Sequence, residues 1–164
     1  MPEPRWLARA REYIGLREIV GPKHNAIILR WWEAIKAPFR DDETPWCAGY
    51  VGGVLEAEGI KSTRSAAARS YLKFGTALPA PAVGCIVVFW RGKPSGWSGH
   101  VGFVVGKDKA GNLMVLGGNQ GNAVNIKPFG KDRVLGYRWP DNSVKPDAKL
   151  PLLRSDGKLS RDEA

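Results

Sequence analysis

Five short segments rich in β-branched and aromatic residues crowd the second half of this chain, and they restrict its fold more than any other feature. They are CIVVFWR, HVGFVVGKD, LMVLGG, AVNIKPF and VLGYRW, all between residues 85 and 139. Glycine, proline or asparagine separates them, which is typical of strands, and KDKAGN predicts a hairpin turn. Because helical patterns precede these strands, we expect an α+β fold rather than alternating βαβ units.

The first half of the chain predicts helices by its apolar periodicity and by its start and stop signals. In one of them Thr44 is a good N-cap residue, and Pro45 suits the first helical position. The four predicted helices cover residues 5–15, 24–37 and 44–59 and a segment from Ser62 or Ser65 to Gly75, and a Pro/Ala linker follows. We expect one domain over residues 1–140 and a charged, loosely ordered tail over residues 141–164.

Composition excludes several classes of protein. The 164 residues are 43% hydrophobic and 25% charged, which suits one soluble domain. No stretch approaches the roughly 18 apolar residues of a membrane span. The N-terminus has no apolar signal-peptide region, so we expect synthesis in the cytoplasm. The two cysteines, Cys47 and Cys85, make neither a disulfide scaffold nor a zinc site, and no cofactor is expected.

The net charge of +9 predicts attraction to polyanions, which include nucleic acid, anionic lipid and an anionic cell-wall polymer. Charge alone does not choose among them. The chain has no recognisable nucleic-acid-binding motif and no long basic run, so no specific nucleic-acid partner is expected. A basic wall-binding or nucleic-acid-binding protein without catalysis is nevertheless one alternative.

Cys47, in TPWCAGYVGG, falls in the first turn of the predicted helix over 44–59. There the unpaired backbone N–H groups and the helix dipole favour a thiolate, the form that acts as a nucleophile. The alternative is that Cys47 is a buried structural thiol without a chemical role. The glycines that follow, Gly49, Gly52 and Gly53, fit either close packing of the helix on the sheet or room for a substrate.

A nucleophilic thiol needs a base, and the chain has two histidines, His24 and His100. His100 lies behind a Ser-Gly turn at the mouth of an apolar strand, whereas a surface or capping role suits His24. The base in turn needs an orienting group. Asn119, in VLGGNQG, is our candidate because it ends the strand expected to pair with that of His100. Gln120 and Asn122 are the substitutes, and the alternative for GGNQGN is simply a turn.

Taken in order, TPWCAGYVGG, PAVGCIVVFWRG, GHVGFVVG, VLGGNQGNAVNI and VLGYRWP resemble a family of small phage- and prophage-associated cell-wall hydrolases. That family belongs with the CHAP and NlpC-type cysteine peptidases, the papain-like amidases of bacterial peptidoglycan. The resemblance covers nearly everything from Trp6 to Pro140. It implies a papain-like arrangement in which N-terminal helices pack on a small antiparallel β-sheet.

By this resemblance Cys47 corresponds to the nucleophile and His100 to the base, while Asn119 falls where CHAP-type enzymes carry a third polar residue. Two features depart from the pattern. NlpC-type relatives often use a second histidine as orienter, and no histidine follows His100 here. The family usually has aspartate where this chain has Cys85, which we expect to pack in the core.

The resemblance implies cleavage of an amide bond in the stem peptide, the cross-bridge or the muramyl-peptide link. The backbone N–H of Cys47 would hold the oxyanion, and no metal is required. Trp46, Trp90, Trp97 and Gln120 are candidates to line the substrate cleft.

We expect a monomer that acts as a phage or prophage endolysin on peptidoglycan. It would be made in the host cytoplasm and would reach the wall after holin-type release or other export. A secretion-system amidase effector is the alternative within the enzyme class, because it would use the same chemistry on the same polymer.

Overall fold

The computed structural model describes residues 3–160, and a six-stranded antiparallel sheet forms its centre. The sheet has the order β1-β6-β2-β3-β4-β5. Its strands are β1 (Thr76–Leu78), β2 (Ile86–Trp90), β3 (Gly99–Lys107), β4 (Leu113–Gly117), β5 (Asn125–Phe129) and β6 (Val134–Trp139). All five predicted strands are present, and the α+β class is confirmed. The short β1 lies in the predicted linker and pairs with β6.

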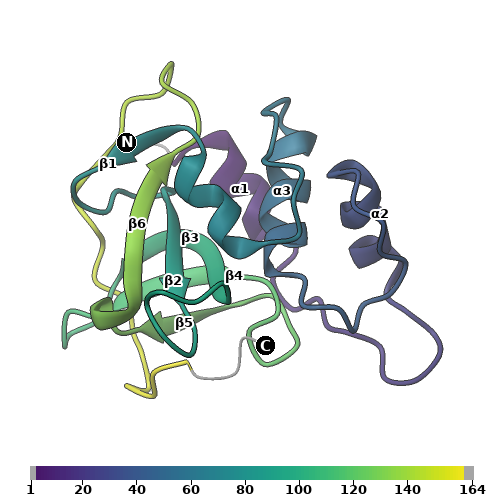
Figure 1. Cartoon of the computed structure of the whole chain (residues 1–164). Helices are drawn as coiled ribbons and strands as arrows, with labels where there is room; N and C mark the ends of the chain where they lie inside the picture. Colours follow the sequence, from purple (N-terminus) through teal and green to yellow (C-terminus); the bar gives the residue numbers. More distant parts are fainter. Residues whose placement is uncertain (1–2, 161–164) are drawn as a thin grey trace.

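The helices are α1 (Arg5–Arg11), α2 (Ala26–Ala34) and α3 (Cys47–Ala57), with short 3-10 helices η1 (Ala68–Lys73) and η2 (Lys131–Arg133). Only η1 forms where the fourth helix was predicted. Thr44 is not the N-cap of α3, because its backbone N–H and hydroxyl both donate to the Asp41 carboxylate, at 2.6 and 3.2 Å. In Figure 1, α3 lies between the sheet and α2, which stands at the outer edge of the molecule.

Helix α3 is the buried centre of the helical layer, since every residue from Cys47 to Leu55 is buried. Its glycines admit the tryptophans of α2. A Cβ at Gly53 would overlap the Trp31 ring, and one at Gly49 would lie 3.1 Å from the Trp32 ring. These two glycines therefore serve close packing between the helices α2 and α3 rather than substrate access.

The sheet curls strongly. Phe89 on β2 and Phe129 on β5 stack with their ring centroids 4.6 Å apart, although β3 and β4 lie between their strands. The His100 ring, on β3, stacks on Phe129 at 5.3 Å with 4° between the planes. The rings of Phe89, Phe129 and His100 thus form one stack on this face of the curled sheet.

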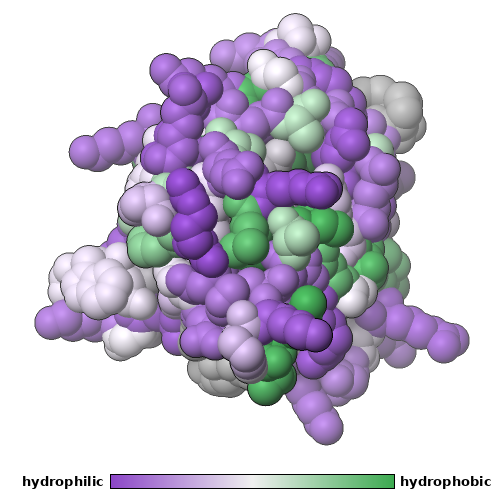
Figure 2. Space-filling model, turned by 90° about the vertical axis from the view of Figure 1, so that its right-hand side faces the viewer, coloured by the Kyte–Doolittle hydropathy of each residue, from purple (hydrophilic) through white to green (hydrophobic). Residues whose placement is uncertain are grey.

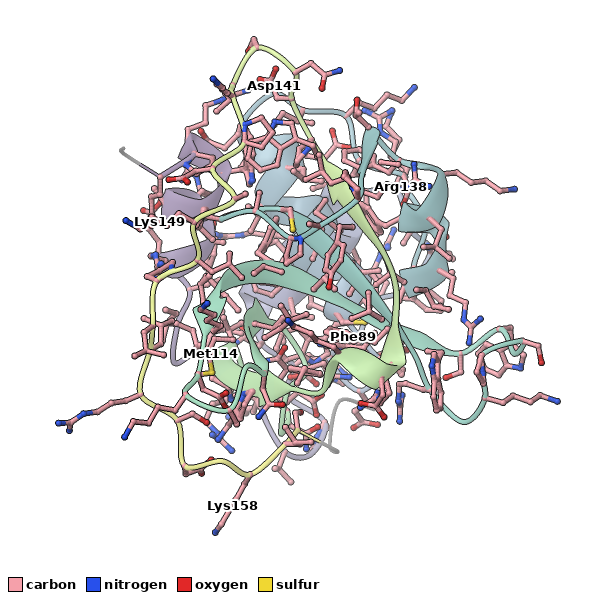
Figure 3. All side chains as sticks on the ribbon, turned by 90° about the vertical axis from the view of Figure 1, so that its left-hand side faces the viewer. Phe89, Met114, Arg138, Asp141, Lys149 and Lys158 are labelled. Atoms are coloured by element: carbon pink, nitrogen blue, oxygen red, sulfur yellow. The ribbon has the colours of Figure 1, made fainter. Side chains whose placement is uncertain are left out.

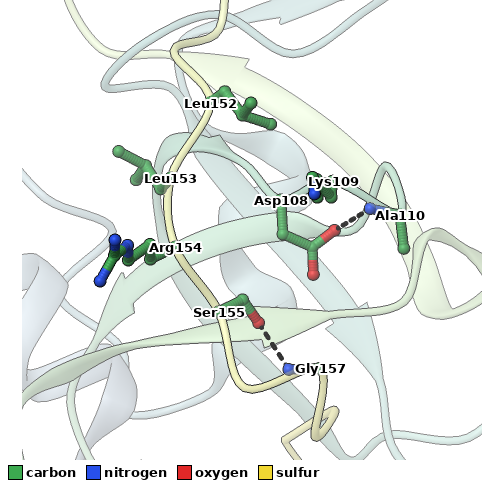
Figure 4. Close-up of a pocket in the computed structure, with 8 residues that line it drawn as sticks. All are labelled: Asp108, Lys109, Ala110, Leu152, Leu153, Arg154, Ser155 and Gly157. Atoms are coloured by element: carbon green, nitrogen blue, oxygen red, sulfur yellow. Dashed lines mark hydrogen bonds between the residues drawn. The ribbon is translucent and has the colours of Figure 1, made fainter.

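The tail beyond Asp141 runs past Lys149 to Lys158 along the outside of the sheet (Figure 3). It forms a parallel bridge with the end of β3, where the Lys107 N–H donates to the Pro151 carbonyl at 2.9 Å and the Leu153 N–H donates to the Lys107 carbonyl at 2.8 Å. A cavity of about 390 Å³ separates it from the turn at Asp108 (Figure 4). The loose order predicted for this tail stays a prediction.

The side of the molecule that carries α2 is largely hydrophilic, with apolar residues gathered in a smaller area near its centre (Figure 2). Among residues 3–160, no helix has the length and apolar character needed to cross a membrane.

Asp42 is fully buried and ties the segment that precedes α2 to the rest of the fold. Its carboxylate accepts hydrogen bonds from the backbone of Ile19 at 2.7 Å and of Asn25 at 2.9 Å. His24 Nδ1 lies 3.0 Å from the same carboxylate, so this histidine pairs with a buried side chain, and Asn25 rather than His24 caps α2. Burial alone would raise the pKa of Asp42, but these hydrogen bonds hold that pKa below its ordinary value.

We predict that Asp42→Asn lowers the free energy of unfolding by about 1–3 kcal/mol at neutral pH. An asparagine has only one side-chain oxygen, so one of the groups that now bond to the carboxylate would face an amide N–H instead of an acceptor. The contribution of Asp42 is present above the unfolded pKa of about 3.9 and is lost as pH falls through the lower folded value. Urea unfolding should therefore show a smaller difference in the free energy of unfolding between the unmodified chain and Asp42→Asn at pH 3 than at pH 7. Asp156→Asn, at an exposed position, is the control. Equal effects of the two substitutions at pH 7 would contradict the prediction.

Candidate active site

Cys47 is the first residue of α3, and no acidic residue occupies the first turn of this helix. Backbone N–H groups at a helix start and the helix dipole favour a negative charge, so the position suits a thiolate. The residue is 4% exposed, whereas Cys85 is completely buried. Both cysteines are buried, and Cys47 is the one that keeps a small exposed fraction.

Trp46, the N-cap residue of α3, is fully buried. Its indole N–H donates to the Glu18 carboxylate at 2.7 Å. Its ring packs on Gly118 so closely that a Cβ there would lie 2.7 Å from Trp46 Cζ3. The predicted cleft-lining role of Trp46 is therefore wrong, since its contacts bury the side chain and fix the position of the neighbouring Cys47.

His100 is the second residue of β3, lies opposite Phe89 of β2 and is completely buried. Its Nε2 atom lies 2.9 Å from Oε1 of Gln120. The stack with Phe129 and this hydrogen bond together fix the plane of the imidazole.

The orientation of the Gln120 amide follows from its other contacts. Gln120 Nε2 donates to the Asn125 carbonyl at 2.9 Å, to Asn125 Oδ1 at 3.0 Å and to the Val115 carbonyl at 3.3 Å. Asn125 Nδ2 donates in return to the Gln120 carbonyl at 2.8 Å. Because the amide nitrogen faces three acceptors, the amide oxygen must face His100. His100 Nε2 then carries the proton, and Nδ1 is the basic nitrogen of the neutral ring.

Asn119 does not orient His100, so the third member of the predicted triad is wrong. Strand β4 ends at Gly117, and Asn119 adopts a left-handed conformation with φ 61°, which turns the chain. The side chain that returns to the imidazole is therefore that of Gln120, one of the two substitutes we considered. Among the described residues, the buried Asn119 amide has no hydrogen-bond partner. The other substitute, Asn122, is exposed.

Gly117 and Gly118 place His100 and the residues around the start of α3 on opposite sides of one dipeptide. A Cβ at Gly117 would overlap Gln120 Oε1 and would lie 3.2 Å from His100 Nε2. A Cβ at Gly118 would lie 2.7 Å from both Trp46, the N-cap residue of α3, and Tyr50, in the first turn of that helix. The start of α3, the start of β3 and the end of β4 therefore meet at one end of the sheet, with Cys47 and His100 among them.

Cys85 has none of these features. It is a free thiol, its sulfur accepts a hydrogen bond from the Ala82 N–H at 3.5 Å, and burial raises its pKa to about 12. Neither cysteine is in a disulfide, so Cys47 and Cys85 are not linked to each other. Within residues 3–160, no group of three or more histidine, cysteine and acidic side chains could hold a metal ion.

The remaining cleft candidates lie in different surroundings. Gln120 is 1% exposed and holds the imidazole rather than lining a cleft. Trp90 is partly buried at the end of β2, and Trp97 is 88% exposed in the loop that follows.

Comparison with known proteins identifies the family. A family model described as the CHAP domain matches residues 39–119. The matched range contains Cys47 and His100 and ends one residue before Gln120. No curated protein matches the chain. The chain carries a CHAP domain over this range, which confirms the predicted CHAP/NlpC-type family, while its phage association stays a prediction. Such domains are typically amidases or peptidases that act on peptidoglycan.

We predict that Gly117→Ala lowers peptidoglycan turnover by about tenfold to a hundredfold without unfolding the chain, because the new methyl group displaces the Gln120 amide from His100. The control is Gly136→Ala in β6, whose Cβ would meet only Leu72, at 3.3 Å. Release of soluble wall fragments measures turnover, and thermal melting monitored by circular dichroism checks the fold. Equal turnover in the two variants would show that Gln120 need not contact the ring.

The two thiols should also differ in reactivity. At neutral pH, iodoacetamide should modify Cys47 in the folded protein and leave Cys85 unmodified, because a buried thiol with a raised pKa supplies almost no thiolate. Mass spectrometry of tryptic peptides gives both extents of labelling. Both cysteines should react in denaturant, which controls for peptide recovery. Rapid native labelling of Cys85 would be inconsistent with its burial.

Proposed function

We propose that this chain, which carries a CHAP domain over residues 39–119, hydrolyses an amide bond of peptidoglycan with Cys47 as the nucleophile and His100 as the base. The bond lies in the stem peptide, the cross-bridge or the muramyl-peptide link. The observation that carries this proposal is the 2.9 Å contact from His100 Nε2 to Gln120 Oε1, at the end of the sheet where α3 begins. It leaves Nδ1 as the nitrogen that can take a proton.

The first half of the reaction forms an acyl-enzyme. His100 Nδ1 takes the proton of the Cys47 thiol, and the thiolate attacks the amide carbonyl carbon. The backbone N–H of Cys47, at the start of α3, stabilises the oxyanion of the tetrahedral intermediate. The imidazolium then gives its proton to the leaving amine as the C–N bond breaks. Throughout, Gln120 Oε1 accepts the hydrogen bond from Nε2 and keeps the ring in place.

The second half of the reaction releases the product. A water molecule gives a proton to His100 Nδ1 and attacks the thioester carbonyl. The C–S bond breaks, the wall fragment leaves as a carboxylic acid, and Cys47 regains its proton. Gln120 is a neutral orienter, so it stabilises the imidazolium less than a carboxylate would.

In the cell, we propose that the protein is a monomeric endolysin of a phage or prophage. It would be made in the host cytoplasm and would act on the wall after holin-type release or other export. The net charge of +9 supports the assignment to the wall, because it favours association with an anionic polymer.

The decisive experiment is mass spectrometry of muropeptides released from purified sacculi, because the new end groups identify the bond that was cut. We expect Cys47→Ala to release nothing, and Gln120→Ala to lose about 1–3 kcal/mol of transition-state stabilisation yet keep residual turnover. Asn119→Ala is the neighbouring control and should retain more activity than Gln120→Ala. Continued release of cleaved muropeptides by a folded Cys47→Ala variant would sink the proposal.

A further inference from the structure

The loop between β2 and β3, residues 91–98, presents the most exposed aromatic side chain of the described part of the chain. Trp97 is 88% exposed. By contrast, five other tryptophans are at most 4% exposed; they are Trp6, Trp31, Trp32, Trp46 and Trp139. An indole left in water gives up the stabilisation of hydrophobic burial, so an exposed tryptophan on an ordered loop suggests a partner.

The loop is held firmly even though its tip is exposed. The Arg69 guanidinium donates to three of its backbone carbonyls, those of Ser98 at 2.8 Å, Pro94 at 2.8 Å and Lys93 at 3.0 Å. The Arg91 N–H also donates to the Ser98 carbonyl at 3.1 Å, which closes the base of the loop. The two limbs are therefore tied together, and Trp97 is preorganised for binding. Figure 3 shows the loop projecting from the body of the molecule beyond Phe89.

The surface around Trp97 is polar and basic. A shallow cavity of about 300 Å³ lies in the loop itself and is lined by Arg91, Gly92, Lys93, Gly96, Trp97 and Ser98. On the other side of Arg69, a hollow of about 600 Å³ includes the hydroxyl-bearing residues Thr63 and Ser70 and the cation of Lys73. An aromatic face beside hydroxyl groups and cations is the combination that suits a sugar polymer bearing carboxylates.

We propose that this loop surface binds the glycan strand of peptidoglycan, with a sugar ring stacked on Trp97 and wall carboxylates beside Arg91 and Lys93. The proposal rests on the proposed function, because it takes peptidoglycan as the substrate. Trp97 lies three residues before His100, so a glycan bound here is held next to the catalytic end of the sheet.

A membrane is a poorer fit to the same surface. Interfacial binding needs a continuous apolar face. The other large exposed hydrophobic residues, Ile14, Ile19, Val20 and Leu152, come from other segments of the chain. One indole among cations and glycines is a stacking platform rather than an anchor in acyl chains.

The first test is binding of a peptide-free glycan oligomer built of N-acetylated sugars. Because Trp97 is the most exposed tryptophan, stacking should shift the emission to the blue and protect it from iodide quenching. We expect Trp97→Ala to abolish this response. Co-sedimentation should show that the substitution weakens sacculus binding by about three- to tenfold, the effect of one aromatic stacking contact.

Two variants make the test specific. Trp97→Phe keeps an aromatic face and should retain most of the binding to sacculi. Val20→Ala removes an apolar side chain that is 98% exposed outside the loop, and it should bind like the unmodified chain. In kinetics on sacculi, Trp97→Ala should raise KM while kcat at saturating substrate stays unchanged.

The outcomes separate this inference from the proposed function. If the unmodified chain binds the glycan through Trp97 but releases no cleaved muropeptide, hydrolysis fails and the glycan surface stands. If the chain cleaves the wall while Trp97→Ala keeps full sacculus affinity and KM, the glycan surface is overturned. A Trp97-dependent blue shift on anionic phospholipid vesicles, without any response to glycan, would also overturn it and assign the loop to a lipid surface.

Discussion

The hydrogen bonds that hold the Gln120 amide are the constraint on which the candidate site depends. The amide nitrogen faces the Asn125 carbonyl, Asn125 Oδ1 and the Val115 carbonyl, so the oxygen has one direction left, toward His100. Reversing the amide would leave several buried groups unpaired, at about 1–3 kcal/mol each. A carboxylate at this position would meet the same acceptors with no donor to offer. A neutral amide therefore suits this position, and its orientation decides which nitrogen of the neutral imidazole carries the proton.

Close packing is the second constraint, because large side chains fill the places that a Cβ would take. Glycine allows this packing in two parts of the fold. At Gly117 and Gly118 the missing side chains let the imidazole approach from one side and Trp46 from the other. At Gly53 the missing side chain admits Trp31, so α2 can lie against the helix that carries Cys47. The sequence suggested that glycines near Cys47 serve either packing or access. The structure shows packing at this position, because a ring of α2 fills the place of a Cβ.

Local patterns predicted the strands, the order of the elements and the place of Cys47 near a helix start, because periodicity and turn residues act over short distances. The errors arose where individual side-chain hydrogen bonds and one backbone turn decide, whether the partners are near or far apart in the sequence. Asp41 binds Thr44 and moves the start of α3 to Cys47. Glu18 binds Trp46 across 28 positions and buries it. The choice of Gln120 over its neighbour depends on one left-handed residue after β4, which no periodicity reveals.

The site extends beyond the matched range of 39–119 on both sides. Gln120 and Asn125 follow the matched range. The segment that precedes α2 forms backbone hydrogen bonds with Val124, which lies between them. In that segment the Gly15 N–H donates to the Val124 carbonyl at 2.9 Å, and the Val124 N–H donates to the Leu16 carbonyl at 2.8 Å. Two positions on, the Glu18 carboxylate accepts a hydrogen bond from the indole of Trp46, the residue before Cys47. The same short segment therefore braces the strand that follows the orienter and the helix start that carries Cys47. The geometry around Cys47 and His100, the proposed catalytic pair, is accordingly a property of the whole curled sheet and its N-terminal support.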